Sequence, residues 1–174
     1  MSAVFALAAC AGTAPKASYE KDQAVTIPVA AFDQVQVKVE ANTGVTLLDY
    51  ERARMVDELK SAIDSRRAQN LAPLSDPRDL GVTVTITRYQ KGNAFARAMM
   101  AGLGQVHLDG HVVLARTSDG TTLSDFTMSK TFAWGGIYGA STSMEDIEHT
   151  FAEGVAEALT GIKDGKKSAS KSKS

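Results

Sequence analysis

Alternating hydrophobic and polar residues mark four stretches of the chain as β-strands. The clearest is 81–89, which places valine and isoleucine on one face and threonine on the other. The same alternation runs through 25–40, after a break at Pro28, and through 105–116. A turn at Thr117–Gly120 then leads into a returning strand, so the pattern predicts that the last two strands form a hairpin.

The returning strand has its apolar residues out of step. Phe126, Met128 and Phe132 share one parity, whereas Leu123 falls on the other. A β-bulge near Ser124 would bring both sets onto the core side. We therefore expect an irregular register at the start of this strand.

Apolar residues spaced at helical intervals predict two helices. In 47–68 the apolar stripe is formed by Leu48, Met55, Val56, Leu59 and Ile63. The charged residues between them, which we assign to the solvated face, are Glu51, Arg52, Arg54, Asp57, Glu58 and Lys60. The second helix is expected to begin at a capping box from Thr142 to Glu145 and to stop at Gly161.

The order of these elements predicts an α+β fold of two layers. We expect a mainly antiparallel four-stranded sheet with both helices packed on one face, in the order β-α-β-β-β-α. The chain has 174 residues, 44% of them hydrophobic, which suits one domain, and we place it at 25–162. Residues 11–24 have the composition of a flexible tether, and the Lys- and Ser-rich tail 163–174 is expected to be disordered.

The single cysteine, Cys10, ends an apolar run of small residues, AVFALAAC. One cysteine excludes an intramolecular disulfide and a four-cysteine zinc site. The Leu7-Ala8-Ala9-Cys10 pattern resembles the lipobox of bacterial lipoproteins, which implies that residues 1–10 are a signal peptide remnant and that Cys10 carries a diacylglycerol. No Lys or Arg precedes Cys10. Either the true start lies upstream of Met1, or this is an ordinary N-terminus with a buried cysteine.

The residue after Cys10 bears on location. By analogy with lipoprotein sorting in enterobacteria, Ala11 in place of Asp implies the outer membrane. No other stretch approaches the roughly 18 apolar residues of a membrane-spanning helix. The resemblance therefore implies a domain anchored to the outer membrane through lipidated Cys10 and facing the periplasm.

Three features together resemble a family of small bacterial lipoproteins catalogued only as a domain of unknown function. They are the lipobox, the stretch from Lys91 through Gly104 into a strand, and the Asp119-Gly120 hairpin followed by a Gly-rich turn and a closing helix. The resemblance implies an envelope location and no particular activity. It also implies a fold similar to the α/β domain of lipoproteins that activate cell-wall synthases and of the Tol-system propeller protein, which is a fold analogy alone.

His107, Asp109 and His111 form a ligand-like pattern on one face of a predicted strand. At about 3.3 Å per residue the two histidines lie about 13 Å apart, too far to share one ion. Only His107 with Asp109, helped by another strand, could bind a metal. We therefore expect a solvated sheet face here and no metal or other cofactor.

A segment of small residues before this strand carries Phe95, Met99, Met100 and Leu103. These four side chains either pack in the core or form a docking patch for a partner. The pair Gly102 and Gly104 precedes a strand, whereas the dinucleotide-binding motif follows one, so we reject a nucleotide site.

The sequence contains no catalytic constellation, and we expect no enzyme activity. A net charge of −1 provides no general attraction for nucleic acid. The first hypothesis is a lipid-anchored periplasmic binding or adaptor domain that contacts another envelope protein. The alternative is a small-ligand or metal-binding lipoprotein that uses the His107 face or the loop 135–139. The sequence does not indicate the oligomeric state.

Overall fold

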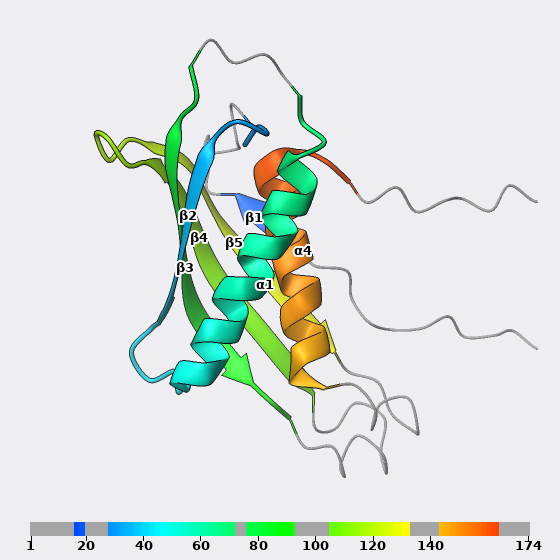
Figure 1. The fold of residues 1–174 in the computed structure, drawn as a ribbon. Coiled ribbons are helices and arrows are strands. Elements are labelled where there is room, and N and C mark those ends of the chain that lie inside the picture. The colour runs from blue at the N-terminus through cyan, green and yellow to red at the C-terminus, as the bar shows by residue number, and fades with distance from the viewer. Residues whose placement is uncertain (1–15, 20–27, 72–75, 93–104, 133–142, 164–174) are drawn as a thin grey trace, which may run out of the picture.

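Two helices cover one face of a single β-sheet (Figure 1). The computed structural model describes residues 16–19, 28–71, 76–92, 105–132 and 143–163. The elements in chain order are β1 (Lys16–Tyr19), β2 (Gln34–Ala41), α1 (Asp49–Arg67), β3 (Asp79–Gln90), β4 (Val106–Arg116), β5 (Thr122–Phe132) and α4 (Met144–Thr160). Within these residues no helix combines the length and the apolar character that crossing a membrane requires.

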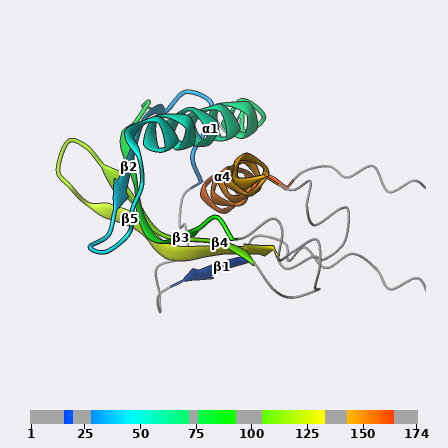
Figure 2. The ribbon, with the colours of Figure 1, turned by 90° about the horizontal axis from the view of Figure 1, so that it is seen from below.

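The sheet has the order β1-β5-β4-β3-β2. The expected α+β class and the two helices on one face are confirmed, as the view along the sheet shows (Figure 2). The expected mainly antiparallel sheet is wrong, because β2 and β3 are parallel and the sheet is therefore mixed. Helix α1 connects these two strands as a crossover, which returns the chain to the same end of the sheet.

The fifth strand, β1, lies in the stretch that we expected to be a tether, residues 11–24. Lys16 to Tyr19 pair antiparallel with Ser129 to Phe126 of β5. The expectation of four strands, and of an unstructured chain at these four residues, is therefore corrected. The sequence of β1 is only four residues long, KASY, which is too short for an alternation of apolar and polar residues to indicate a strand.

The predicted bulge in β5 is confirmed. Leu114 of β4 lies opposite Ser124, whereas the next residue, Ala115, lies opposite Thr122. Leu123 is therefore the extra residue, and the shift returns the apolar residues of β5 to the face that the helices cover.

The core lies between this face and the helices. Helix α1 packs on β2 and α4, and α4 packs on β4 and β5. Gly110 allows α4 to approach closely, because a Cβ there would lie 3.0 Å from Cζ of Phe151 and 3.3 Å from Cγ1 of Val84. The largest fully buried side chains are Phe126, Phe151, Met55, Leu59, Ile63, Leu80, Ile86, Leu108, Leu114, Met128, Leu159 and Glu148.

Helix α4 begins one residue later than the predicted box indicated. The Ser143 hydroxyl accepts from the N–H of Asp146 at 3.2 Å, and Oδ2 of Asp146 accepts from the N–H of Ser143 at 2.9 Å. The helix ends as predicted at Gly161, whose φ of 70° is the left-handed conformation that favours glycine.

A buried carboxylate fixes the chain before β2. Asp33 accepts hydrogen bonds from the N–H of Ala30 at 2.8 Å and from the N–H and Nε of Arg78 at 3.1 and 3.0 Å. Burial alone would raise the pKa of Asp33, but these hydrogen bonds and the Arg78 charge hold it below its usual value. The first residues of β2 and β3 are thereby held together.

Candidate binding groove on helix α1

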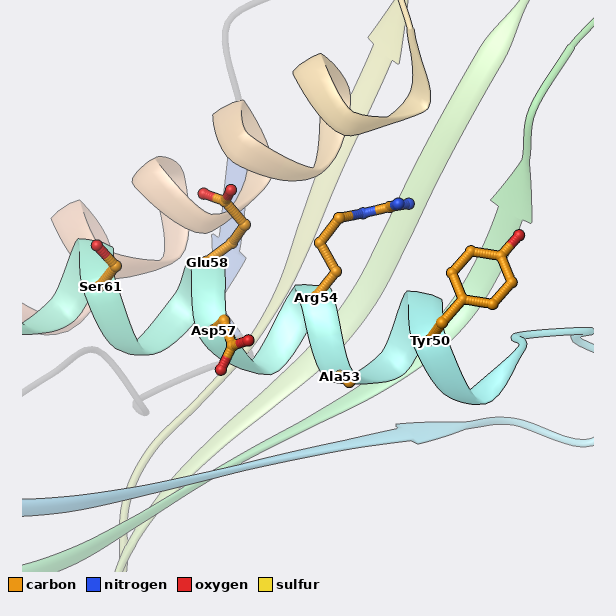
Figure 3. Close-up of a pocket in the computed structure, with 6 residues that line it drawn as sticks. All are labelled: Tyr50, Ala53, Arg54, Asp57, Glu58 and Ser61. Carbon is orange, nitrogen blue, oxygen red and sulfur yellow. The ribbon is translucent and has the colours of Figure 1, made fainter.

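A shallow groove of about 490 Å³ runs along the exposed side of α1 (Figure 3). Tyr50 lies at one end of it and has 60% of its surface exposed. The Arg54 guanidinium lies 6.0 Å from the centre of the Tyr50 ring, within the range of a cation–π contact. The lining residues are Tyr50, Ala53, Arg54, Asp57, Glu58 and Ser61. We call this surface the α1 groove.

Glu148 of α4 contacts Arg54 from the buried side of the α1 groove and holds it in position. The Glu148 side chain is fully buried, and its two oxygens accept from Nε of Arg54 at 2.6 Å and from Nη2 at 3.0 Å. The Tyr89 hydroxyl of β3 also donates to Glu148. Nη1 of Arg54 reaches outward to Glu145 at 3.0 Å, so two carboxylates, those of Glu148 and Glu145, hold the guanidinium in place.

The protonation states agree with this geometry. Burial raises the pKa of Tyr89, and its hydrogen bond to Glu148 raises it further, so the hydroxyl remains a donor. The hydrogen bonds to Glu148 likewise raise the pKa of Arg54. Arg54 is therefore a permanent cation, with 28% of its side chain exposed at the groove.

A second buried carboxylate, Glu51, lies on the sheet side of α1. Its side chain is 3% exposed and accepts from Nζ of Lys91 at 2.5 Å and from the N–H of Leu48 at 3.0 Å. Burial would raise the pKa of Glu51, but these contacts hold it below its usual value. Lys91 also lies 5.8 Å from the centre of the Tyr89 ring. The two carboxylates thus join α1, α4 and β3 below the groove.

The far side of the groove is acidic. Asp57 and Glu58 both lie about one turn after Arg54, and Figure 3 shows Glu58 directed toward α4. There Oε2 of Glu58 lies 2.9 Å from Nδ1 of His149, a contact that raises the pKa of His149. The groove therefore presents an aromatic ring and a fixed guanidinium beside exposed carboxylates.

The predicted His-Asp-His face forms, but its two histidines have separate partners. His107, Asp109 and His111 are half-buried on the sheet face away from the helices. Nδ1 of His107 lies 3.1 Å from Oγ1 of Thr131, and Nε2 of His111 contacts Asp125. Burial and the nearby Arg88 lower the pKa of His107. In the described part of the chain no group of three His, Cys, Asp or Glu residues is arranged to hold a metal ion.

The other predicted site residues lie outside the described residues. These are the lipidation site Cys10, the docking candidates Phe95, Met99, Met100 and Leu103, and the loop 135–139.

The sequence analysis assigned Glu51 to the solvated face and did not identify the groove. Both buried carboxylates had a recognisable signal, because Glu51 lies four residues before Met55 and Glu148 four before Ala152, each on the buried side of its helix. A carboxylate on an apolar face requires a partner. The pattern could not show that Arg54 would be the partner of Glu148 and Lys91 the partner of Glu51.

Comparisons with known proteins identify a matching family and solved structures of similar fold. The family model described as a domain of unknown function, DUF4410, matches residues 14–136. PelC from Paraburkholderia phytofirmans, solved as a dodecamer, is similar at 11% identity and a TM-score of 0.56, over 86% of this chain and 99% of PelC. A second crystal form, of a PelC variant, gives 12% identity and a TM-score of 0.54, over 87% and 99%.

A minor lipoprotein from Acinetobacter baumannii is similar at 11% identity and a TM-score of 0.36, over 70% of this chain and 88% of that one. No curated protein sequence matches the chain. At these identities the structural likeness to PelC concerns the fold alone.

Proposed function

The chain belongs to the DUF4410 family of domains of unknown function, and from that premise we propose that it is a non-enzymatic binding or adaptor domain of the bacterial envelope. It is anchored through a lipid on Cys10, on the periplasmic side of the outer membrane, and it acts by contacting another envelope protein. The observation that carries the proposal is the α1 groove, in which exposed Tyr50 lies beside a fixed Arg54.

The rigidity of the groove supports a role in binding. Tyrosine and arginine are enriched among the residues that contribute most to protein interfaces. A side chain held in place before binding loses less conformational entropy when the partner arrives. Glu148 and Glu145 hold Arg54 in this way, while 28% of its side chain remains exposed.

The charges of the groove indicate the chemistry of the partner. The guanidinium of Arg54 is already neutralised by Glu148, whereas Asp57 and Glu145 extend toward solvent. A partner segment complementary to the α1 groove therefore carries a Lys or Arg beside an apolar side chain, and this apolar side chain packs on the Tyr50 ring. PelC, whose fold is similar, assembles with copies of itself, so a domain of this shape is compatible with work through protein contacts.

Site-specific photo-crosslinking in the bacterial envelope tests the proposal. Tyr50 is replaced by a photo-crosslinking phenylalanine derivative in the full chain, and Ser118, in the exposed β4–β5 turn, serves as the matched control position. We expect a product of defined mass with an envelope protein from position 50 only. Asp57→Lys should reduce its yield severalfold, whereas Asp119→Lys should not.

Two outcomes would overturn the proposal. One is that positions 50 and 118 give the same products, which would mean that the groove has no preferred partner. The other is that Cys10→Ser leaves the protein in the membrane fraction with its crosslinks unchanged, which would remove the lipid anchor from the proposal.

A further inference from the structure

Strand β2 forms one edge of the sheet, and its outer side has no partner among the described residues. It is eight residues long, QVQVKVEA, without proline or bulge. Val35 and Val37 point to the helix side but are only half-buried, because no described element lies beyond this edge (Figure 2). Long, regular edge strands are templates for pairing with another strand.

The free backbone groups of β2 can be assigned residue by residue. The N–H of Gln34 donates to Arg78 at 2.8 Å and that of Asn42 donates to Ile86 at 2.9 Å, so the even-numbered residues face β3. Alternation along a strand then directs the N–H and C=O groups of Val35, Val37, Val39 and Ala41 outward. These four residues are the ones that a new strand would bond.

We propose that β2 pairs with β2 of a second copy of this chain. The two strands run antiparallel about a two-fold axis at Val39, and the two sheets become one. Val39 then lies opposite Val39 of the second copy, and Val37 lies opposite Ala41. In both pairs the backbone N–H and C=O groups that point away from β3 bond to each other.

Charge complementarity selects the second copy as the partner and this register as the alignment. Lys38 and Glu40 point to the face away from the helices, where 70% and 45% of their side chains are exposed, and their charged groups lie 2.5 Å apart. With the axis at Val39, Lys38 lies directly opposite Glu40 of the second copy, and Glu40 opposite its Lys38. The four charges form a square of alternating sign.

Neighbouring registers lose this match. With the axis at Lys38, two lysines would face each other, and with the axis at Glu40, two glutamates would do so. With the axis at Val37, Lys38 would face Gln36 and Glu40 would face Gln34. Only the axis at Val39 satisfies both charges, because like charges directly opposite each other destabilise a strand pair.

Charge reversal tests this register. In Lys38→Glu, or in Glu40→Lys, both attractive pairs become repulsive, and we expect dimerisation to weaken by about tenfold, as measured by sedimentation across a concentration series. The double variant Lys38→Glu/Glu40→Lys restores the alternating square, and its dimerisation should return to the wild-type value. Lys60→Glu, an exposed change on α1, is the matched control.

Hydrogen exchange provides a second readout on the wild-type protein. As the concentration rises, the amides of Val37, Val39 and Ala41 should become protected, whereas those of Lys38 and Glu40 are already bonded to β3 at any concentration. Thermal unfolding of each variant at low concentration shows whether the monomer itself is intact.

The proposal fails if the wild type remains monomeric throughout the series. It also fails if the double variant stays as weak as the single ones, since that outcome would indicate a contact between different surfaces, such as those that generate rings. None of these results depends on the α1 groove, so the crosslinks from position 50 remain a separate measurement.

Discussion

Replacing Glu148 by glutamine tests the arrangement below the α1 groove. The substitution preserves the shape of the side chain and one carbonyl oxygen. This oxygen can still accept from the Tyr89 hydroxyl and from Nη2 of Arg54. The new amide places an N–H opposite the Nε–H of Arg54, where the carboxylate oxygen now accepts at 2.6 Å. Two donors then face each other where the side chain at position 148 is fully buried.

The expected loss of stability follows from the exposure of the two partners. Removing one member of a fully buried ion pair costs about 3–5 kcal/mol. Arg54, however, retains Glu145 and has 28% of its side chain exposed, so water and Glu145 compensate in part. We therefore expect a loss of about 2–3 kcal/mol, from a total that is about 5–15 kcal/mol for a typical domain.

Urea unfolding followed by circular dichroism measures this loss as a lower midpoint at an unchanged slope. Glu145→Gln is the matched control, because Glu145 binds the same guanidinium but is 57% exposed, and we expect it to cost about 0–1 kcal/mol. Equal losses for the two variants would refute the reasoning, since it attributes the larger loss to the burial of Glu148 and to the donors that its replacement leaves facing each other.

Two further predictions concern the core and the start of β2. Gly110→Ala should destabilise the domain by about 1–2 kcal/mol in the same assay, because its Cβ would crowd Phe151 and Val84, whereas Gly81→Ala, with no contact under 3.5 Å, should be neutral. The pKa of Asp33 is lowered in the fold, so its contribution is complete above its unfolded value of about 3.9 and is lost as the pH falls below it. Wild type should therefore exceed Asp33→Asn in stability at neutral pH, and the difference should shrink on acidification; a difference independent of pH would contradict this assignment.

Periodicity was sufficient to predict the four long strands and both helices, because each has a buried face whose residues recur at a fixed interval. It even located the bulge, since Leu123 breaks the parity of β5 and the break requires an extra residue. The direction of pairing was harder to predict. That β2 lies beside β3 in parallel depends on how α1 crosses the sheet, which is a property of the packed structure.

The α1 groove was not predicted because it, too, depends on contacts between elements in the packed structure. Charged residues on a helix are usually solvated, and Glu51 was assigned by its charge and not by its place on the helix. The pairing of Arg54 with Glu148 joins residues 94 positions apart, and no local pattern encodes such a distance. The short strand β1 was missed because pairing with β5, and not its own composition, defines it.

The two proposed interaction surfaces use charge in opposite ways. A buried ion pair adds little net stability compared with apolar residues of the same volume, because both charges lose their hydration. Stability alone therefore does not account for the Arg54–Glu148 pair, and in the proposed function its role is to position a guanidinium beside Tyr50. On β2, Lys38 and Glu40 are exposed and weak as a pair, but their order along the strand determines which register a second copy can adopt. At the α1 groove, the buried Glu148 fixes the position of the Arg54 guanidinium. At the β2 edge, the exposed charges of Lys38 and Glu40 can pair with those of a second copy and so select the register.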